Sequence, residues 1–354
     1  MRDVPRIDLD DSEDRLVDAL DDACSGAGCF VVDGSPVPLA SLSRLLSESA
    51  TFFALPEPEK AAVAMQHSGA AWRGWFPVGG ELTSGAADHK EGLYFGTDDE
   101  TVADDVVVGD GRGAARATVP PMHGRNLYPA VPASMASTVP SVLAGLSGLG
   151  RSLVDFLDRG LGVSGRLLAL VEDPLVLLRV FHYPARERAR TGGPDGAFGV
   201  GEHTDYGLLT MLYTDGPGLQ VYAGGRWVDV DPGAGLFCNI GDMLERATGG
   251  RYRATRHRVL TTSNGKRSIA CFFDPGWYAR VPNLLGDAVA GRPAGAADAA
   301  GTRWDGVDPH LFDGPYGSYV WSKVSKVFPD LAASGSAAIP ASAPGDGVAS
   351  AGGR

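Results

Sequence analysis

A histidine and an aspartate stand two positions apart within residues 199–212, G-V-G-E-H-T-D-Y-G-L-L-T-M-L, directly before an apolar run. Residues i and i+2 of a β-strand point to the same face, so His203 and Asp205 are expected to project side by side. One imidazole and one carboxylate supply two ligands of a three-ligand metal site. The tripeptide H-x-D arises often by chance, and a structural hydrogen-bonded pair is the alternative interpretation.

His257 is the candidate for the third ligand. It opens the β-branched run H-R-V-L-T-T after a glycine pair, and several predicted strands separate it from Asp205. Such a series of strands can return to the same end of a barrel and bring the three side chains together. Two histidines and one carboxylate form the facial triad of non-haem Fe(II) oxygenases, whose remaining coordination positions stay open for a co-substrate and dioxygen.

The elements that must position these residues are mainly short strands. Strands are predicted at residues 4–9, 29–32, 175–183, 208–213, 219–222, 227–230, 235–240, 257–262 and 268–273. Helices are predicted after Ser12 and at residues 38–54, 140–162 and 316–331. Residues 223–226, A-G-G-R, predict a hairpin turn, and residues 85–135 are expected to be loop-rich. Many short strands in series indicate a sandwich or barrel.

Composition limits the class of protein. The chain has 354 residues, a formal net charge of −12 and four scattered cysteines. The acidic charge argues against nucleic acid as the main partner. No apolar run approaches the roughly 20 residues that span a bilayer, and the N-terminus lacks the apolar stretch of a secretory signal. Reduced thiols and a cytoplasmic location are therefore expected.

Several sequence motifs follow one another in a fixed order along most of the chain. The second half contains G-E-H-T-D-Y-G-L-L-T-M-L, G-L-Q-V-Y-A-G-G-R-W-V-D-V, N-I-G-D-M-L, Y-R-A-T-R-H-R-V-L and S-I-A-C-F-F-D-P. The first half contains P-R-I-D-L, F-F-A-L-P-E-P-E-K and H-G-R-N-L-Y-P, and Y-G-S-Y-V-W-S-K-V-S-K-V-F-P closes the series. Over about residues 4–331 the chain resembles the isopenicillin N synthase-like branch of the Fe(II)/2-oxoglutarate oxygenases.

The resemblance implies a mainly β fold with flanking helices and a double-stranded β-helix (jelly-roll) core. It implies an N-terminal α/β region with substrate-side loops over residues 1–140 and the oxygenase core with its closing helix over 141–331. The low-complexity composition of residues 332–354 separately predicts a disordered tail. By motif position, His203, Asp205 and His257 would be the catalytic iron ligands. The retained Asp205 favours hydroxylation, desaturation or ring formation over halogenation.

The family binds the distal carboxylate of 2-oxoglutarate with Arg-x-Ser, and this chain departs from that pattern. In N-G-K-R-S-I-A-C-F-F-D-P, Ser268 occupies the serine position, Lys266 the arginine position, and Arg267 stands one residue late. Because positions 266 and 268 share a strand face, either Lys266 binds the carboxylate as a point charge or a bulge turns Arg267 inward. A different co-substrate is a third possibility. Tyr183 is a further co-substrate contact by position, with a core aromatic as the alternative.

Two neighbouring segments, W-R-G-W-F-P-V-G-G-E-L-T-S-G and D-H-K-E-G-L-Y-F-G, are expected at the mouth of the active site. Arg73, Glu81 and Lys90 could recognise a small polar substrate there. Ion pairs of Arg73 with Glu81, and of Lys90 with Glu91, could instead fix the loop to the barrel. Asn239, in N-I-G-D, is interpreted as structural rather than catalytic.

The predicted function is that of a non-haem Fe(II)/2-oxoglutarate-dependent dioxygenase. It would use Fe(2+), 2-oxoglutarate and O2 to hydroxylate or desaturate a small molecule, with succinate and CO2 as co-products. The alternatives are an oxidase of the same fold that does not use 2-oxoglutarate, a zinc hydrolase with the same ligands, and a non-catalytic ligand-binding module. No nucleic-acid or membrane partner is expected, and the chain is expected to be a monomer or weak homo-oligomer.

Overall fold

The structure is a computed structural model that describes residues 4–98, 119–186, 198–286 and 306–329. The tail predicted at residues 332–354 lies outside the described residues. None of the helices in the described ranges combines the length and apolar character that crossing a lipid bilayer requires.

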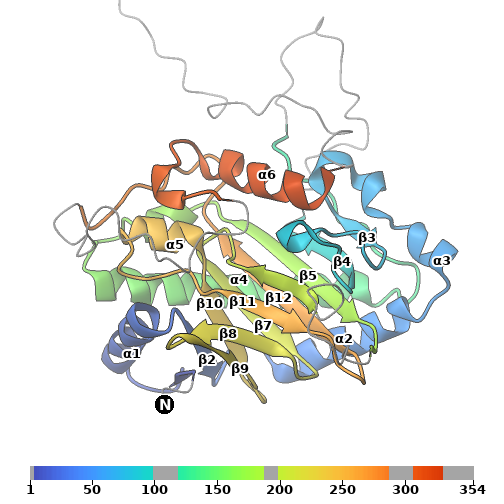
Figure 1. Cartoon of the computed structure of the whole chain (residues 1–354), viewed down its shortest axis with the longest axis horizontal. Helices are drawn as coiled ribbons and strands as arrows, with labels where there is room; N and C mark the ends of the chain where they lie inside the picture. Colours follow the sequence, from blue (N-terminus) through green and yellow to red (C-terminus); the bar gives the residue numbers. More distant parts are fainter. Residues whose placement is uncertain (1–3, 99–118, 187–197, 287–305, 330–354) are drawn as a thin grey trace, which may run out of the picture.

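Two β-sheets form the centre of the molecule (Figure 1). The main sheet has eight strands in the order β1-β2-β10-β7-β12-β5-β4-β3. In that order they are Arg6–Asp8, Cys29–Asp33, Leu236–Ile240, Leu209–Thr214, Lys266–Asp274, Leu175–Tyr183, Glu91–Gly96 and Gly74–Phe76. The smaller sheet, β6-β11-β8-β9, consists of Phe198–His203, His257–Leu260, Leu219–Ala223 and Arg226–Asp229. The main sheet therefore combines strands from both sides of the boundary predicted at residue 140.

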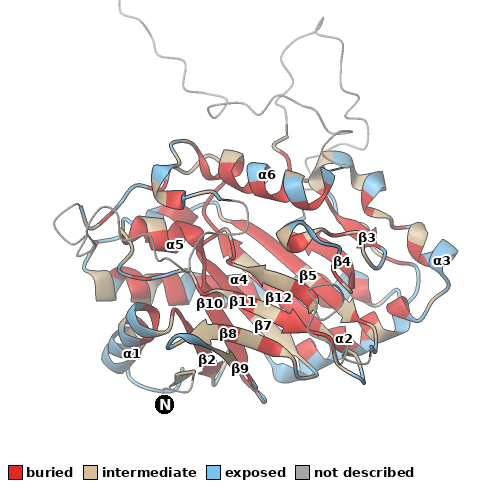
Figure 2. Ribbon diagram, viewed as in Figure 1, coloured by how far each residue is buried: buried red, intermediate tan, exposed pale blue. Residues whose placement is uncertain are grey.

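Helices cover the main sheet and the open side between the sheets. The described helices are α1 (Glu13–Gly26), α2 (Leu39–Phe53), α3 (Glu57–Ala61), α4 (Met135–Leu161), α5 (Asp242–Ala247) and α6 (Tyr316–Val327). The long helix α4 crosses behind the main sheet and contacts α1, α2, β5, β7 and β12 (Figure 1). Figure 2 shows the buried residues concentrated in the strands and on the inward faces of the helices, as amphipathic helices packed on a sheet require.

The helix α4 illustrates how sequence sets this packing. Leu146, Leu149, Leu153 and Leu157 recur at helical spacing, and all four are buried. Gly150 allows the close approach to the sheet, because a Cβ atom there would lie 2.6 Å from Cγ of Phe273. All four long helices were predicted from sequence, and the structure confirms α1, α2 and α4 with shifts of a few residues at the ends. It also confirms α6, whose predicted last residues, 330–331, lie outside the described residues.

The connection between β8 and β9 has the predicted turn. Gly224 and Gly225 both have positive φ angles, 57° and 80°, which suit a tight hairpin turn and favour glycine. The expectation of a loop-rich segment at residues 85–135 was wrong at β4, Glu91–Gly96, which is a fully buried strand. The charged pair Lys90 and Glu91 resembles a loop signal, but both side chains are buried and ion-paired.

Candidate active site

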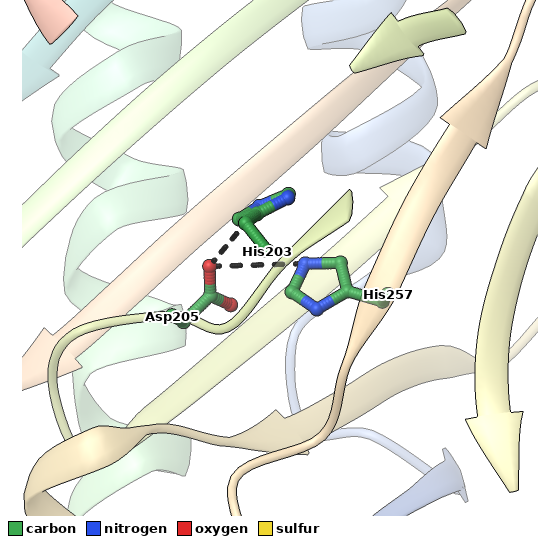
Figure 3. Close-up of side chains that lie close together, drawn as sticks. All are labelled: His203, Asp205 and His257. Carbon is green, nitrogen blue, oxygen red and sulfur yellow. Dashed lines mark ion pairs between the residues drawn. The ribbon is translucent and has the colours of Figure 1, made fainter. Parts of the chain in front are cut away.

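The structure brings the three predicted ligands together at one end of the smaller sheet. His203 is the last residue of β6 and His257 the first of β11, and the two residues pair directly across the strands. The Nε2 atoms of both histidines lie 3.7 Å from Oδ1 of Asp205. All three ligand atoms lie within 4.8 Å of one another (Figure 3). Two imidazoles and one carboxylate at this spacing suit a single ferrous ion.

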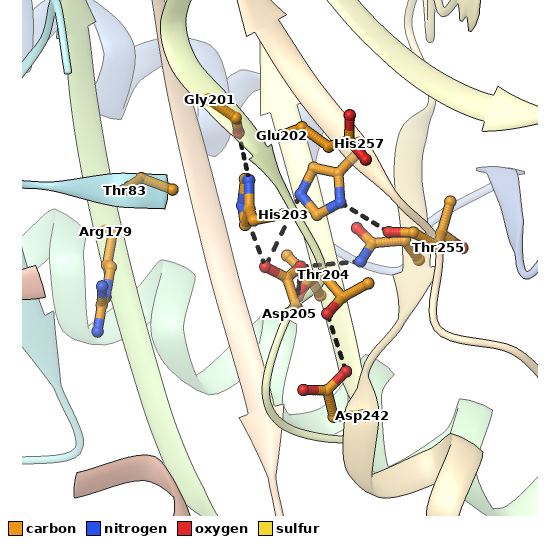
Figure 4. A network of polar contacts seen from close by, with 12 residues as sticks. Thr83, Arg179, Gly201, Glu202, His203, Thr204, Asp205, Asp242, Thr255 and His257 are labelled. Carbon is orange, nitrogen blue, oxygen red and sulfur yellow. Dashed lines mark hydrogen bonds and ion pairs between the residues drawn. The ribbon is translucent and has the colours of Figure 1, made fainter. Parts of the chain in front are cut away.

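Strand alternation does not explain the position of Asp205, contrary to the expectation from sequence. The strand β6 ends at His203, and Asp205 lies in the turn that follows. The turn is fixed by backbone, because the Asp242 N–H donates to the Asp205 carbonyl at 2.8 Å. Thr204, between the two ligands, donates its hydroxyl to Oδ1 of Asp242 at 2.9 Å (Figure 4).

Backbone carbonyls orient both imidazoles. Nδ1 of His203 lies 2.8 Å from the Gly201 carbonyl, and Nδ1 of His257 lies 3.0 Å from the Thr255 carbonyl (Figure 4). Each Nδ1–H therefore donates to a carbonyl, and each Nε2 lone pair faces Asp205 and the metal position. Burial, with the neighbouring His257, lowers the pKa of His203 to about 4, so its imidazole is neutral and ready to ligate at neutral pH.

Hydrogen bonds from two other strands fix the Asp205 carboxylate. Its Oδ2 accepts from Oγ1 of Thr210 at 2.5 Å and from Nδ2 of Asn239 at 2.8 Å. Burial alone would raise the pKa of Asp205, but the two imidazoles and these hydrogen bonds hold it below its usual value. Asn239 was interpreted as a structural residue, and the structure gives it a more specific role, because it orients the metal ligand Asp205. Its position in the sequence did not indicate that role.

Replacing Asn239 with alanine should weaken iron binding without preventing it. Loss of a hydrogen bond to a ligating group typically costs about 10–100-fold in metal affinity. The Fe(II) dissociation constant of Asn239→Ala, measured by anaerobic titration, should rise within that range. Gln220→Ala, which removes a side chain bonded to Asp229 on the β8–β9 hairpin, is the control and should leave the constant unchanged. An unaltered constant in Asn239→Ala would show that Thr210 alone orients the carboxylate.

A cavity opens beside the triad, between the two sheets. Its polar wall includes Glu81, Thr83, Lys90, Arg179, Tyr183 and Tyr206. Apolar side chains from both sheets form most of the remainder, and Val324 and Val327 of α6 close one side. A largely apolar cavity with a few convergent polar groups is the usual form of a small-molecule site.

The register of β12 decides between the two candidate cations for the co-substrate. Lys266 pairs with Tyr183 and Ser268 with Phe181, without a bulge. Arg267 points away and pairs with Asp215, with Nη2 2.7 Å from Oδ2. The hypothesis that a bulge turns Arg267 toward 2-oxoglutarate is therefore wrong, because strand alternation keeps its side chain on the outer face.

Lys266 and Ser268 are both buried on the same face of β12. The Ser268 hydroxyl makes no well-formed hydrogen bond within the described ranges, and its neighbour is the side chain of Tyr183. Nζ of Lys266 lies 5.3 Å from the ring centroid of Tyr183, a residue of the cavity wall, and no ion pair is found for it among the described residues. Burial lowers the pKa of Lys266 to about 8. A buried ammonium without an ion pair and a hydroxyl two residues along the same strand face fit the distal carboxylate of 2-oxoglutarate.

Of the three predicted substrate residues, two line the cavity and one does not. Glu81 and Lys90 line the cavity, and Nζ of Lys90 lies 2.8 Å from Oε2 of Glu81 and 3.0 Å from Oδ2 of Asp88. Arg73 is not on the cavity wall, because its buried guanidinium donates to the Met122 carbonyl at 2.8 Å. The prediction that Arg73 contacts the substrate is therefore not supported.

The alternative ion pairs expected from sequence also differ from those observed. Glu81 pairs with Lys90 rather than with Arg73, and Glu91 pairs with Lys60 at 2.7 Å. Sequence reasoning missed Arg179, which lines the cavity from β5. One signal could have found it: Arg179 interrupts the apolar strand L-V-L-L-R-V-F-H-Y in the same phase as Tyr183.

Two sequence profiles match the chain. Residues 4–129 match the N-terminal region of the non-haem dioxygenase in morphine synthesis, and residues 174–275 match the 2OG-Fe(II) oxygenase superfamily. A "Probable iron/ascorbate oxidoreductase" of Dictyostelium discoideum is 36% identical, over 93% of this chain and 95% of the relative. A 1-aminocyclopropane-1-carboxylate oxidase of Dictyostelium mucoroides is 29% identical, over 92% of this chain and 95% of the relative.

A solved structure shares the fold. A full-length Neurospora crassa protein, crystallised in complex with alpha-KG, gives a TM-score of 0.68 at 22% identity, over 91% of this chain and 96% of that chain. The chain therefore belongs to the 2OG-Fe(II) oxygenase superfamily and has the jelly-roll fold of that family. It is an oxidoreductase whose cofactors are Fe(II) and 2-oxoglutarate, as the sequence motifs indicated.

Proposed function

We propose that this enzyme hydroxylates or desaturates a small organic molecule at the His203, Asp205 and His257 site. The single observation that supports this best is the convergence of the three ligand atoms within 4.8 Å beside a cavity. Ferrous iron bound there, with 2-oxoglutarate and dioxygen, supplies the oxidising chemistry, and succinate and CO2 are the co-products.

The protein residues have separate tasks in this proposal. The triad holds the metal from one side, and the cavity leaves the other side accessible. Lys266 and Ser268 hold the distal carboxylate of 2-oxoglutarate, with Tyr183 packed beside the ammonium. Val324 and Val327 of α6, together with the apolar wall, limit access of water to the reacting groups.

We also infer a monomer or weak homo-oligomer that works in the cytoplasm without nucleic acid or membrane partners. The net charge of −12 supports the absence of a nucleic-acid partner, and the four buried, unpaired cysteines support a reducing compartment. Size-exclusion chromatography with light scattering tests the oligomeric state, and a mass of a tetramer or larger would contradict it.

The experiment that tests the proposed function is a metabolite screen with anaerobically iron-loaded protein. After oxygen and 2-oxoglutarate are added, a true substrate should stimulate succinate formation in a one-to-one ratio with oxidised product. Product formed without succinate would instead indicate an oxidase that does not use 2-oxoglutarate. Turnover that needs no oxygen would contradict the proposal in favour of hydrolysis.

The affinity for 2-oxoglutarate should fall as pH rises through about 8, the pKa of Lys266 in the free enzyme. Bound 2-oxoglutarate, a dianion, favours the charged ammonium of Lys266. The affinity is therefore highest and constant below this pH, and it declines by up to about tenfold per pH unit above it. Two groups beside Lys266 do not reverse the trend. Asp215 favours the charged form, and burial keeps Tyr183 neutral by raising its pKa to about 12.

Titrations of 2-oxoglutarate at pH 7, 8 and 9 measure this effect. Lys266→Arg is the matched variant, because a guanidinium stays charged over the whole range. Its dissociation constant should stay nearly level while that of the wild type rises. Parallel curves for the two proteins would mean that another group controls the pH dependence.

A further inference from the structure

Arg179 is a cavity residue that the proposed chemistry does not use. It lies on β5 and faces the cavity across from the triad (Figure 4). Arg179 and Tyr183 share the inner face of β5, four residues apart, which corresponds to about 13 Å along a strand. Lys266 pairs with Tyr183 and Ala270 pairs with Arg179, so the two cations stand at different levels of the paired strands β5 and β12.

Two aromatic rings hold the Arg179 guanidinium. Its Cζ lies 4.1 Å from the ring centroid of Tyr94 and 5.0 Å from that of Phe272. Stacking against rings fixes the plane of a guanidinium while leaving its edge N–H groups able to donate. The arrangement orients a planar, two-pronged donor that is already largely out of water.

The Glu81 carboxylate does not accept a hydrogen bond from Arg179. Nη1 of Arg179 lies 3.8 Å from Oε1 of Glu81, beyond hydrogen-bond distance. The other oxygen, Oε2, is occupied by Nζ of Lys90 at 2.8 Å and by the Tyr94 hydroxyl at 2.7 Å. Lys90 also pairs with Asp88 at 3.0 Å, so its ammonium group has two carboxylate partners, Glu81 and Asp88. Arg179 and Oε1 of Glu81 thus form an adjacent donor and acceptor on the cavity wall.

We propose that Arg179 and Glu81 bind the head group of an α-amino acid substrate. The substrate carboxylate accepts two hydrogen bonds from the Arg179 fork, and the ammonium group donates to Oε1 of Glu81. An α-amino acid carries these two groups on one carbon, which matches a guanidinium and a carboxylate oxygen that are neighbours. This inference rests on the proposed function, because it names the substrate class of the same site.

Matched ligands test the inference without altering the protein. The twenty proteinogenic L-amino acids are titrated calorimetrically into anaerobic protein loaded with Fe(II) and 2-oxoglutarate. Each amino acid that binds is compared with its α-amide, which lacks the carboxylate charge, and with its des-amino acid. We expect the amide and the des-amino acid each to bind at least about tenfold more weakly than the parent, since each leaves one charged partner unpaired.

The variant Arg179→Gln should lose this preference for acid over amide, and Arg179→Lys should retain part of it. Circular dichroism checks that both variants are folded. The inference is overturned if no amino acid in the panel binds, if acid and amide bind equally to the wild type, or if Arg179→Gln keeps the preference.

The affinity for 2-oxoglutarate, measured on the same samples, separates this inference from the proposed function. A wild-type protein that does not bind 2-oxoglutarate would refute the proposed function itself. Normal binding of 2-oxoglutarate without a preference for acids would refute only the head-group site. If Arg179→Gln loses 2-oxoglutarate while Lys266→Met keeps it, Arg179 binds the co-substrate and the head-group site is wrong.

Discussion

His203→Ala should abolish iron binding and turnover. The substitution leaves Asp205 and His257 as the two remaining ligands, and two ligands hold a divalent ion far more weakly than three. Changing a group that only orients a ligand already costs about 10–100-fold in affinity, so loss of the ligand itself should exceed about 100-fold. Iron content after anaerobic loading and desalting, measured by mass spectrometry, should fall from about one per chain to near zero.

Loss of iron must be distinguished from loss of the fold. The buried His203 is neutral at neutral pH, because burial lowers its pKa to about 4, so its removal leaves no unpaired charge behind. His203→Ala should therefore retain the circular dichroism spectrum of the wild type. His67→Ala is the matched control, because His67 is an exposed histidine bonded through its ring to the Ala61 carbonyl. Full iron content in folded His203→Ala would refute the assignment of the triad.

The metal site could be predicted from sequence because its ligand types are rare in combination and stand at strand ends. His203 and His257 terminate two strands that pair directly with each other, so their meeting follows from topology. The orientation of Asp205 could not be predicted, because it depends on Thr210 and Asn239 in two other strands. Local spacing therefore identified the ligands, whereas long-range hydrogen bonds determine how the carboxylate faces the metal.

The substrate-binding cation could not be predicted from the sequence. Arg73, Lys90 and Arg179 are all buried or nearly buried cations, and only their partners decide which of them can bind a ligand. Arg73 is occupied by a backbone carbonyl and Lys90 by two carboxylates. These partners lie in separate segments of the chain, and a burial pattern cannot reveal them. The same reason explains why the ion-paired strand β4 was predicted as a loop.

The comparison of Lys266→Met with Arg267→Met should give a large difference in affinity for 2-oxoglutarate. A charged hydrogen-bonding partner of a buried carboxylate contributes about 1.5–3 kcal/mol, so Lys266→Met should raise the dissociation constant about 10–150-fold. Arg267→Met removes an ion pair with Asp215 in which both side chains are about a third exposed, and it should change the constant by less than about twofold. Calorimetric titration of 2-oxoglutarate into anaerobic, iron-loaded protein measures both.

Stability provides a second readout for Lys266 that a purely structural role would not produce. Its pKa in the folded chain, about 8, is lower than that of a lysine in the unfolded chain. The folded state is therefore destabilised by the charged lysine at all pH values below about 8, and this penalty disappears as pH rises toward the unfolded pKa. Lys266→Met should consequently melt at the same or a higher temperature than the wild type at pH 7, without 2-oxoglutarate.

A variant that gains stability while losing co-substrate affinity identifies a residue that is kept for binding rather than for folding. Lys266→Arg should restore most of the affinity lost in Lys266→Met, because it restores a permanent charge on the inner face of β12. Equal, small effects of Lys266→Met and Arg267→Met would show that neither side chain binds the carboxylate. The cation would then have to come from the cavity wall, where Arg179 is the candidate.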